Sequence, residues 1–264
     1  MKDDPSSVSK ARTRVRSVSR AMQALMVVVD EPDGATATQI ARELGLATPT
    51  VFHLVNTLVD EGLLLKFDRR YHLGPKLGVI ADAFLRQNAP PPHLLGSLRR
   101  LAEQTKETVY ITTWRYGDVM VLASIEGSHP LKAASPHAGY YGHAHARAAG
   151  KCLLAGIGEA ALDAYIATHP LTPLTAKTIT TESELRLALD GVRERGYAVD
   201  DEEFSPGIAC LAMPLTYEKP TLTAFSVAGP AERLYEHQPE YLASLSRAVT
   251  EATEGVAPTP DEDR

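Results

Sequence analysis

Hydrophobic residues recur every three or four positions in three short segments near the start of the chain, and this spacing predicts three amphipathic helices. Ser17, Thr36 and Thr48 stand where N-cap residues are expected, because their hydroxyl oxygens can accept a backbone N–H of the first turn. Gly45 and Gly62 follow the second and third segments, and glycine commonly ends a helix there. The predicted helices span residues 17–30, 37–44 and 49–61.

The segment after the third helix predicts a short hairpin. Residues 63–66 and 71–73 are predicted strands, and the sequence "FDRR" joins them. The order of helix, helix, four-residue turn, helix and hairpin is that of a winged helix-turn-helix. In this motif the helix after the turn lies in the major groove of DNA. Arg69 and Arg70 would then lie at the wing tip, where cationic side chains reach phosphates.

The third predicted helix has an outward face suited to contact with base edges. Phe52 can contact a thymine methyl group, Asn56 can pair with adenine, and His53 can hydrogen-bond to a base. The alternative for Phe52 is that its ring packs on the wing or on a neighbouring helix. The predicted DNA-contacting residues are Thr48, Thr50, Phe52, His53, Asn56, Arg69 and Arg70.

The remaining chain predicts a linker helix and an α+β domain. Apolar residues at helical spacing continue through 74–87, and "APPP" at 89–92 marks a domain boundary. Predicted helices follow at 93–106, 144–155, 160–167, 181–195 and 240–254, and predicted strands at 109–114, 119–126, 197–200, 208–215 and 221–228. The predicted domains are a disordered arm (1–14), a winged helix-turn-helix (15–74), a linker helix (75–92), a ligand-binding domain (93–255) and a disordered tail (256–264).

Charge is divided unevenly along the chain, and this bears on its partners. The net charge is −6, but residues 1–92 hold 12 Lys/Arg and 10 Asp/Glu (+2), whereas residues 93–264 hold 15 and 23 (−8). The arm at 10–20 is basic and could reach a groove or only aid solubility. No segment is long and apolar enough to span a membrane, and no secretory signal begins the chain. We therefore expect a cytoplasmic protein.

Several stretches resemble the IclR-type transcriptional regulators, among them "SVSRAMQAL", "ATQIARELGLATPTVFHLVNTLVDEGLL", "AHARAAGKCLLA" and "GYAVDDEEFSPGIACLAMPL". The resemblance covers residues 15–255. It implies an N-terminal winged helix-turn-helix and a C-terminal GAF-like antiparallel-sheet domain, with flanking helices, that binds a small-molecule effector. The chain departs from the family at Thr48 and His53, where a basic residue and an Arg are usual, and at Arg147 and Ala148, where small residues are more usual.

The resemblance also implies an effector site that uses Asp200 and Cys210. Backbone N–H groups of a helix start at Ala148 and Ala149 would suit an anion, and Ser226 lies on a neighbouring strand. A structural role for Cys210, as a small buried hydrophobic residue, is the alternative. Arg147 would favour an acid if its side chain pointed inward, but on an exposed helix turn the side chain is expected to face water. We expect a carboxylate-bearing metabolite, with a neutral aromatic or sugar-like ligand as the alternative.

Other kinds of site lack support in the sequence. Two cysteines make neither a disulfide framework nor a zinc-finger ligand set, and His129, His137, His143 and His145 are irregularly spaced in a loop where solvated histidines are expected. No cofactor or metal is predicted, and no motif of a nucleophile with its base is present.

Three hypotheses about function therefore remain. The main one is a repressor controlled by an effector, which binds operator DNA as a homodimer or dimer of dimers, with dimer contacts through the N-terminal half. Activation of transcription is open as well. The rivals are an enzyme formed by the C-terminal domain and a DNA-binding dimer that responds to no ligand.

Overall fold

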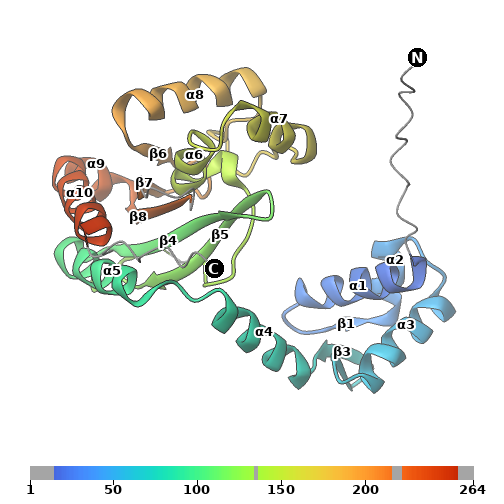
Figure 1. The fold of residues 1–264 in the computed structure, drawn as a ribbon. Helices are drawn as coiled ribbons and strands as arrows, with labels where there is room; N and C mark the ends of the chain where they lie inside the picture. Colours follow the sequence, from blue (N-terminus) through green and yellow to red (C-terminus); the bar gives the residue numbers. More distant parts are fainter. Residues whose placement is uncertain (1–14, 134–135, 216–221, 255–264) are drawn as a thin grey trace, which may run out of the picture. The chain divides into compact units, whose positions relative to one another are not determined.

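The computed structural model describes residues 15–133, 136–215 and 222–254, which form two compact units that divide between Phe84 and Leu85 (Figure 1). Each unit has hydrophobic core residues of its own. The division lies inside the segment for which the sequence predicts a linker helix. No helix in these ranges is long and apolar enough to cross a membrane.

The N-terminal unit is a winged helix-turn-helix, as predicted. Three helices pack around Leu25, Ile40 and Val55, and an antiparallel sheet of strand order β1-β3-β2 adds Leu64 and Tyr71 to this core. Its elements are α1 (Arg16–Val29), β1 (Ala35–Thr36), α2 (Ala37–Leu44), α3 (Thr48–Asp60), β2 (Leu64–Phe67) and β3 (Arg70–Leu73), followed by α4 (Pro75–Gln87). The short strand β1 was not predicted, because two residues carry no alternation to detect.

One of the three predicted N-caps is confirmed. Thr36 begins α2 with a capping box: its Oγ1 accepts the Gln39 backbone N–H at 3.2 Å, and the Gln39 side chain accepts the Thr36 backbone N–H at 2.9 Å. Such reciprocal bonds satisfy donors that the first turn leaves free. Gly45, in the left-handed conformation, ends this helix as predicted.

The other two N-cap predictions are wrong. Val15 precedes α1 and Ala47 precedes α3, and neither makes a side-chain cap. Ser17 therefore lies inside α1, and Thr48 is the first residue of α3. Pro49 stands in the first turn of α3, where its missing N–H costs no hydrogen bond and its fixed φ favours the helix.

The C-terminal unit is a five-stranded antiparallel sheet with helices on both faces, which confirms the α+β class. The strand order is β5-β4-β8-β7-β6. Helices α5, α9 and α10 cover one face, and α6, α7 and α8 cover the other (Figure 1). Its elements are α5 (Pro92–Thr105), β4 (Thr108–Arg115), β5 (Asp118–Ile125), η1 (Ala144–Ala146), α6 (Ala148–Leu154), α7 (Glu159–Thr168), α8 (Glu182–Arg195), β6 (Ala198–Asp201), β7 (Ile208–Leu215), β8 (Thr223–Pro230), α9 (Ala231–Glu236) and α10 (Gln238–Glu254).

Strand alternation decides which side chains face the helix α6. On β8, Phe225 and Val227 enter the core under α5 and α10, and Ala224 enters the core under α6. Because successive side chains point to opposite faces, Ser226 shares the α6 face with Ala224.

The single helix predicted for 144–155 is wrong, because the chain breaks at Arg147. The short helix η1 ends before it, Arg147 adopts an extended conformation (φ −110°, ψ 140°), and α6 begins at Ala148. A Cβ at Gly150 would lie 2.1 Å from the Ala144 carbonyl oxygen, so only glycine lets η1 fold back this closely onto α6. The break changes the direction of the Arg147 side chain.

Candidate functional site

The outward face of α3 is exposed, as a recognition helix requires. Phe52 is 42% exposed, and His53 and Asn56 are exposed beside it. Thr57 is exposed too, but its hydroxyl donates to the His53 carbonyl at 2.9 Å and so bonds within its own helix. The opposite stripe of α3 is buried in the core at Val51, Val55 and Leu58.

The wing borders this face through Lys66 on β2. The Lys66 ammonium lies 6.0 Å from the centre of the Phe52 ring, so the ring lies between the outer face of α3 and the wing. An exposed lysine at this place is a further candidate for phosphate contact, which the sequence analysis missed. Thr48 and Thr50 are half-buried in the first turn of α3.

The two wing arginines do not share one role. Asp68 and Arg69 form the turn with positive φ angles of 46° and 64°, and Arg69 is exposed at the tip, as predicted. Arg70 lies instead on β3, half-buried, and its Nη1 donates to the Gly34 carbonyl at 2.7 Å. Arg70 is therefore beside the turn, where it pairs with Phe67, but its side chain is directed toward the loop before β1 and not toward the tip.

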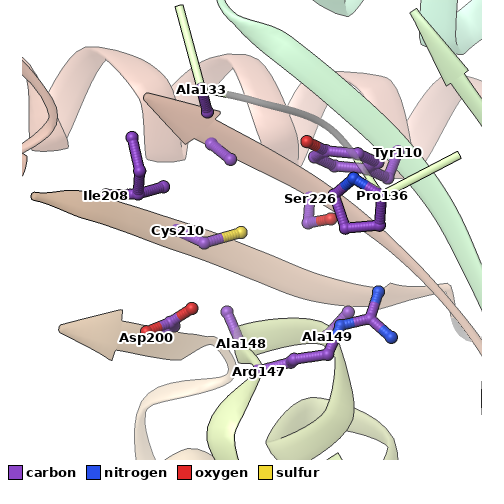
Figure 2. A pocket seen from close by; sticks show the side chains of 11 residues that line it. Tyr110, Ala133, Pro136, Arg147, Ala148, Ala149, Asp200, Ile208, Cys210 and Ser226 are labelled. Carbon is purple, nitrogen blue, oxygen red and sulfur yellow. The ribbon is translucent and has the colours of Figure 1, made fainter. Parts of the chain in front are cut away.

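A cavity of about 50 Å³ lies between the sheet and α6 in the C-terminal unit. Figure 2 shows side chains from β4, β6, β7 and β8 around it, with the start of α6 on the opposite side. All five predicted effector-site residues line it, together with six others. The lining residues are Tyr110, Ala133, Pro136, Arg147, Ala148, Ala149, Asp200, Ile208, Cys210, Ser226 and Ala228.

Strand register brings the sheet side of this cavity together. Asp200 on β6 pairs with Cys210 on β7, and Cys210 pairs with Ala228 on β8. Ser226, two residues from Ala228, pairs with Tyr110 on β4. Residues two apart share a face, so the sequence analysis had a signal for Ala228 beside Ser226, and for Ile208 beside Cys210, that it did not use.

Arg147 is the charged group that dominates the cavity. It is 7% exposed, which contradicts the expectation that it faces water. The guanidinium carbon lies 5.2 Å from the centre of the Tyr140 ring and 5.8 Å from that of Phe204, and Nη1 donates to the Gly142 carbonyl at 3.3 Å. Burial lowers the pKa of the guanidinium. No carboxylate of the described chain forms an ion pair with it.

Asp200 lines the cavity and also holds the backbone of the following turn through hydrogen bonds. Its Oδ1 accepts the backbone N–H groups of Glu203 at 2.7 Å and Phe204 at 3.2 Å, which fixes the turn after β6. Burial raises the pKa of Asp200 to about 7. Near Asp200, Lys151 and Glu203 form a buried ion pair. In the "DDEE" stretch, Asp200 and Glu203 therefore stabilise the local fold.

The remaining predicted groups at the cavity are small or uncharged. Burial raises the pKa of the Cys210 thiol, so the thiol stays protonated, and no histidine lines the cavity within the described residues. Ser226 is buried. The side chains of Ala148 and Ala149 are small and leave space. Because α6 is seven residues long, its dipole is short, and Arg147 is the stronger positive group.

The loop histidines differ in their surroundings. His137 is exposed and His129 and His143 are half-buried, but His145 is 1% exposed, which contradicts the expectation that it is solvated. Its Nε2 lies 3.1 Å from the Thr172 carbonyl. No three His, Cys, Asp or Glu side chains of residues 15–133, 136–215 and 222–254 are arranged to hold a metal ion.

Comparison with known proteins agrees with this architecture along the chain. The family described as "Bacterial transcriptional regulator IclR C-terminal" matches residues 93–254, and the "IclR helix-turn-helix domain" matches residues 17–66. The chain is 31% identical to the HTH-type transcriptional regulator BhcR of Paracoccus denitrificans, over 94% of this chain and 89% of that protein. It is 26% identical to the transcriptional repressor IclR of Escherichia coli, over 92% of this chain and 90% of the repressor.

A solved structure shares the fold. An IclR homolog from Microbacterium hydrocarbonoxydans, complexed with 4-hydroxybenzoate, superposes with a TM-score of 0.68 at 22% identity and covers 90% of this chain and 98% of its own.

Proposed function

The chain belongs to the IclR family of transcriptional regulators, and from that premise we propose that it is a repressor whose affinity for operator DNA is set by a small organic acid bound in the cavity above α6. Family membership makes it a DNA-binding regulator with an effector-binding domain, and not an enzyme. The ligand class, the direction of regulation and the contacting residues are the proposed part.

The observation that carries the ligand class is the buried guanidinium of Arg147. A buried charge without an ionic partner is costly, and a carboxylate placed against it would offset that cost with charge-assisted hydrogen bonds. The aromatic ring that lines the cavity is that of Tyr110, and it suits a planar acid. The 4-hydroxybenzoate held by the Microbacterium relative is a ligand of this kind.

The small volume of the cavity means that ligand binding would have to widen the site. Ligand sites usually exceed roughly 300 Å³, whereas the cavity here measures about 50 Å³. An acid larger than a few water molecules must therefore displace part of the wall. A ligand shifts a conformational equilibrium only through a difference in affinity between the states, and a site that must widen supplies such a difference.

The proposed DNA contacts follow from exposure. Phe52, His53 and Asn56 would contact base edges from α3, and Arg69 and Lys66 would contact phosphates from the wing. Arg70 would hold the wing against the loop at Gly34 instead. The other candidates on α3 are Thr48 and Thr50.

Paired half-sites would require a dimer, and α1 offers a surface for one. Exposed apolar residues follow one another at helical spacing on α1, namely Val18, Met22, Met26 and Val29. An exposed stripe of this kind indicates a protein interface. Replacing both Met22 and Met26 with Glu should yield a monomer in light scattering, while Gln23→Glu, an exposed neighbour on the same helix, should leave the dimer intact. A dimer that survives the double change would place the interface elsewhere.

The test of the function as a whole measures both activities together. A fluorescent DNA fragment from upstream of the gene is titrated with the full chain at two salt concentrations, and binding should weaken with salt as phosphate counterions are released. Benzoate, pyruvate and related acids are then screened for release of the DNA. Binding that no acid changes, while neutral sugars release the DNA, would refute the proposed ligand class. Acids that strengthen DNA binding would refute the proposed direction.

A further inference from the structure

A second cavity, of about 220 Å³, lies in the C-terminal unit, and none of its lining residues lines the effector cavity. Its wall includes Asp118 at the start of β5, Gly142 and His145 near η1, and Tyr165 and His169 at the end of α7. An engineered apolar cavity of about 150 Å³ holds benzene, so this volume is enough for a small organic molecule. The family assignment gives it no role.

Asp118 presents an incompletely paired carboxylate to this cavity. The residue is 2% exposed. Its Oδ1 accepts the Val119 backbone N–H at 2.6 Å. Oδ2 lies 3.6 Å from His169 Nε2, which carries charge only when protonated, and the described chain gives Oδ2 no hydrogen bond. A Cβ at Gly142 would lie 3.8 Å from Oδ2, so this oxygen is at the cavity wall. Burial raises the pKa of Asp118.

His145, which also lines the cavity, has a neutral ring. The Thr172 carbonyl can only accept, so His145 Nε2 carries the proton in their 3.1 Å contact and Nδ1 is left as an acceptor. His145 Nδ1 is buried and has no partner among the described residues. Burial lowers the pKa of His145, which keeps the ring neutral.

The cavity also has a flat aromatic wall. The rings of Tyr165 and His169 stack with centres 4.5 Å apart and planes 15° apart. Arg147 acts on Asp118 only through its field, because its own hydrogen bond goes to the Gly142 carbonyl. The wall therefore combines one buried acid and an aromatic surface.

We propose that this cavity binds a small organic cation, whose ammonium group donates to Asp118 Oδ2 and whose carbon skeleton lies against His169 and Tyr165. An ammonium group supplies the hydrogen-bond donor that Oδ2 lacks among the described residues. A metal ion fits less well, since no three ligands in the described part of the chain are arranged to hold one.

The experiment uses the full chain and benzylamine, which is protonated at neutral pH, with benzyl alcohol as its neutral analogue. Trp114 is the single tryptophan of the chain, and its ring centre lies 5.8 Å from that of Tyr165, so its fluorescence reports on this wall. Benzylamine should give a saturable change. Benzyl alcohol should bind about tenfold more weakly or worse, because one charge-assisted hydrogen bond is lost. This comparison needs no variant.

Asp118→Asn keeps an oxygen for the Val119 N–H and should lower benzylamine affinity by a similar factor while leaving benzyl alcohol unchanged. Asp190→Asn, at an exposed ion pair with Arg193, is the matched control and should change neither. Equal affinities for the amine and the alcohol would overturn the proposal, as would full benzylamine affinity in Asp118→Asn. Binding of zinc chloride without any binding of benzylamine would indicate a metal site and would also overturn the proposal.

Discussion

Replacement of Arg147 by Met tests the proposed ligand class most directly. Methionine has a similar unbranched length and no charge, so it can fill the space against Tyr140 and Phe204. It removes the positive charge that a ligand carboxylate would meet. The backbone break at this position needs no charged side chain.

The replacement should change the free energy of ligand binding and the free energy of unfolding by different amounts. In the complex, a carboxylate loses a charge-assisted hydrogen bond worth about 1.5–3 kcal/mol, which corresponds to an affinity about tenfold to a hundredfold lower. In the free protein, the variant loses the ring contacts and the bond to the Gly142 carbonyl, together about 2 kcal/mol. The variant also no longer buries a charge that forms no ion pair within the described residues, and burial of such a charge costs a free energy of the same order or larger. The free energy of unfolding should therefore stay nearly unchanged or rise.

The assay is calorimetric titration of the wild type and Arg147→Met with benzoate and with pyruvate, together with thermal unfolding of both proteins without ligand. Arg195→Met is the matched control, because the Arg195 guanidinium also lies over a ring, 5.1 Å from the centre of Tyr197, but in an exposed position. Wild-type affinity for both acids in Arg147→Met would refute the reasoning. A large loss of stability in this variant would show that the charge supports the fold instead.

Three further predictions concern other parts of the chain. Burial raises the pKa of Asp200 to about 7, so its contribution to stability is complete below its unfolded pKa and is lost as pH rises from there through 7. In urea denaturation the wild type should therefore lose stability relative to Asp200→Asn between about pH 4 and pH 7, and parallel curves would contradict this. Thr36→Ala removes the capping box of α2 and should cost about 1 kcal/mol in the same assay, whereas Thr57→Ala should cost far less because that hydroxyl bonds within an exposed turn. Arg69→Ala should weaken binding to all DNA sequences and reduce the salt slope by about 1, whereas Arg70→Ala should leave the slope unchanged; equal slopes for both variants would return Arg70 to the phosphate contacts.

The sequence by itself determined the local elements and the family. The helices of the N-terminal unit follow from apolar spacing, and the cap at Thr36 and the end of α2 at Gly45 follow from bonds between residues a few positions apart. The strands of the C-terminal unit follow from alternation, and β7 was predicted with the bounds that it has, Ile208–Leu215. Because these signals depend on near neighbours, they can be read without the fold. The resemblance to the family added the positions of the effector site.

Tertiary structure alone decided how the charged side chains are used. Arg147 looked like a surface residue of a continuous helix, and only the approach of η1 to α6 at Gly150 turns it into the cavity. Arg70 and the buried Asp118 depend in the same way on strand register and on contacts distant in sequence. The free energy of a charge is set by the solvent and partners that surround it, and residues far along the chain supply these. A sequence pattern therefore predicts where a helix or strand forms, whereas the packed fold decides which of its charges are buried.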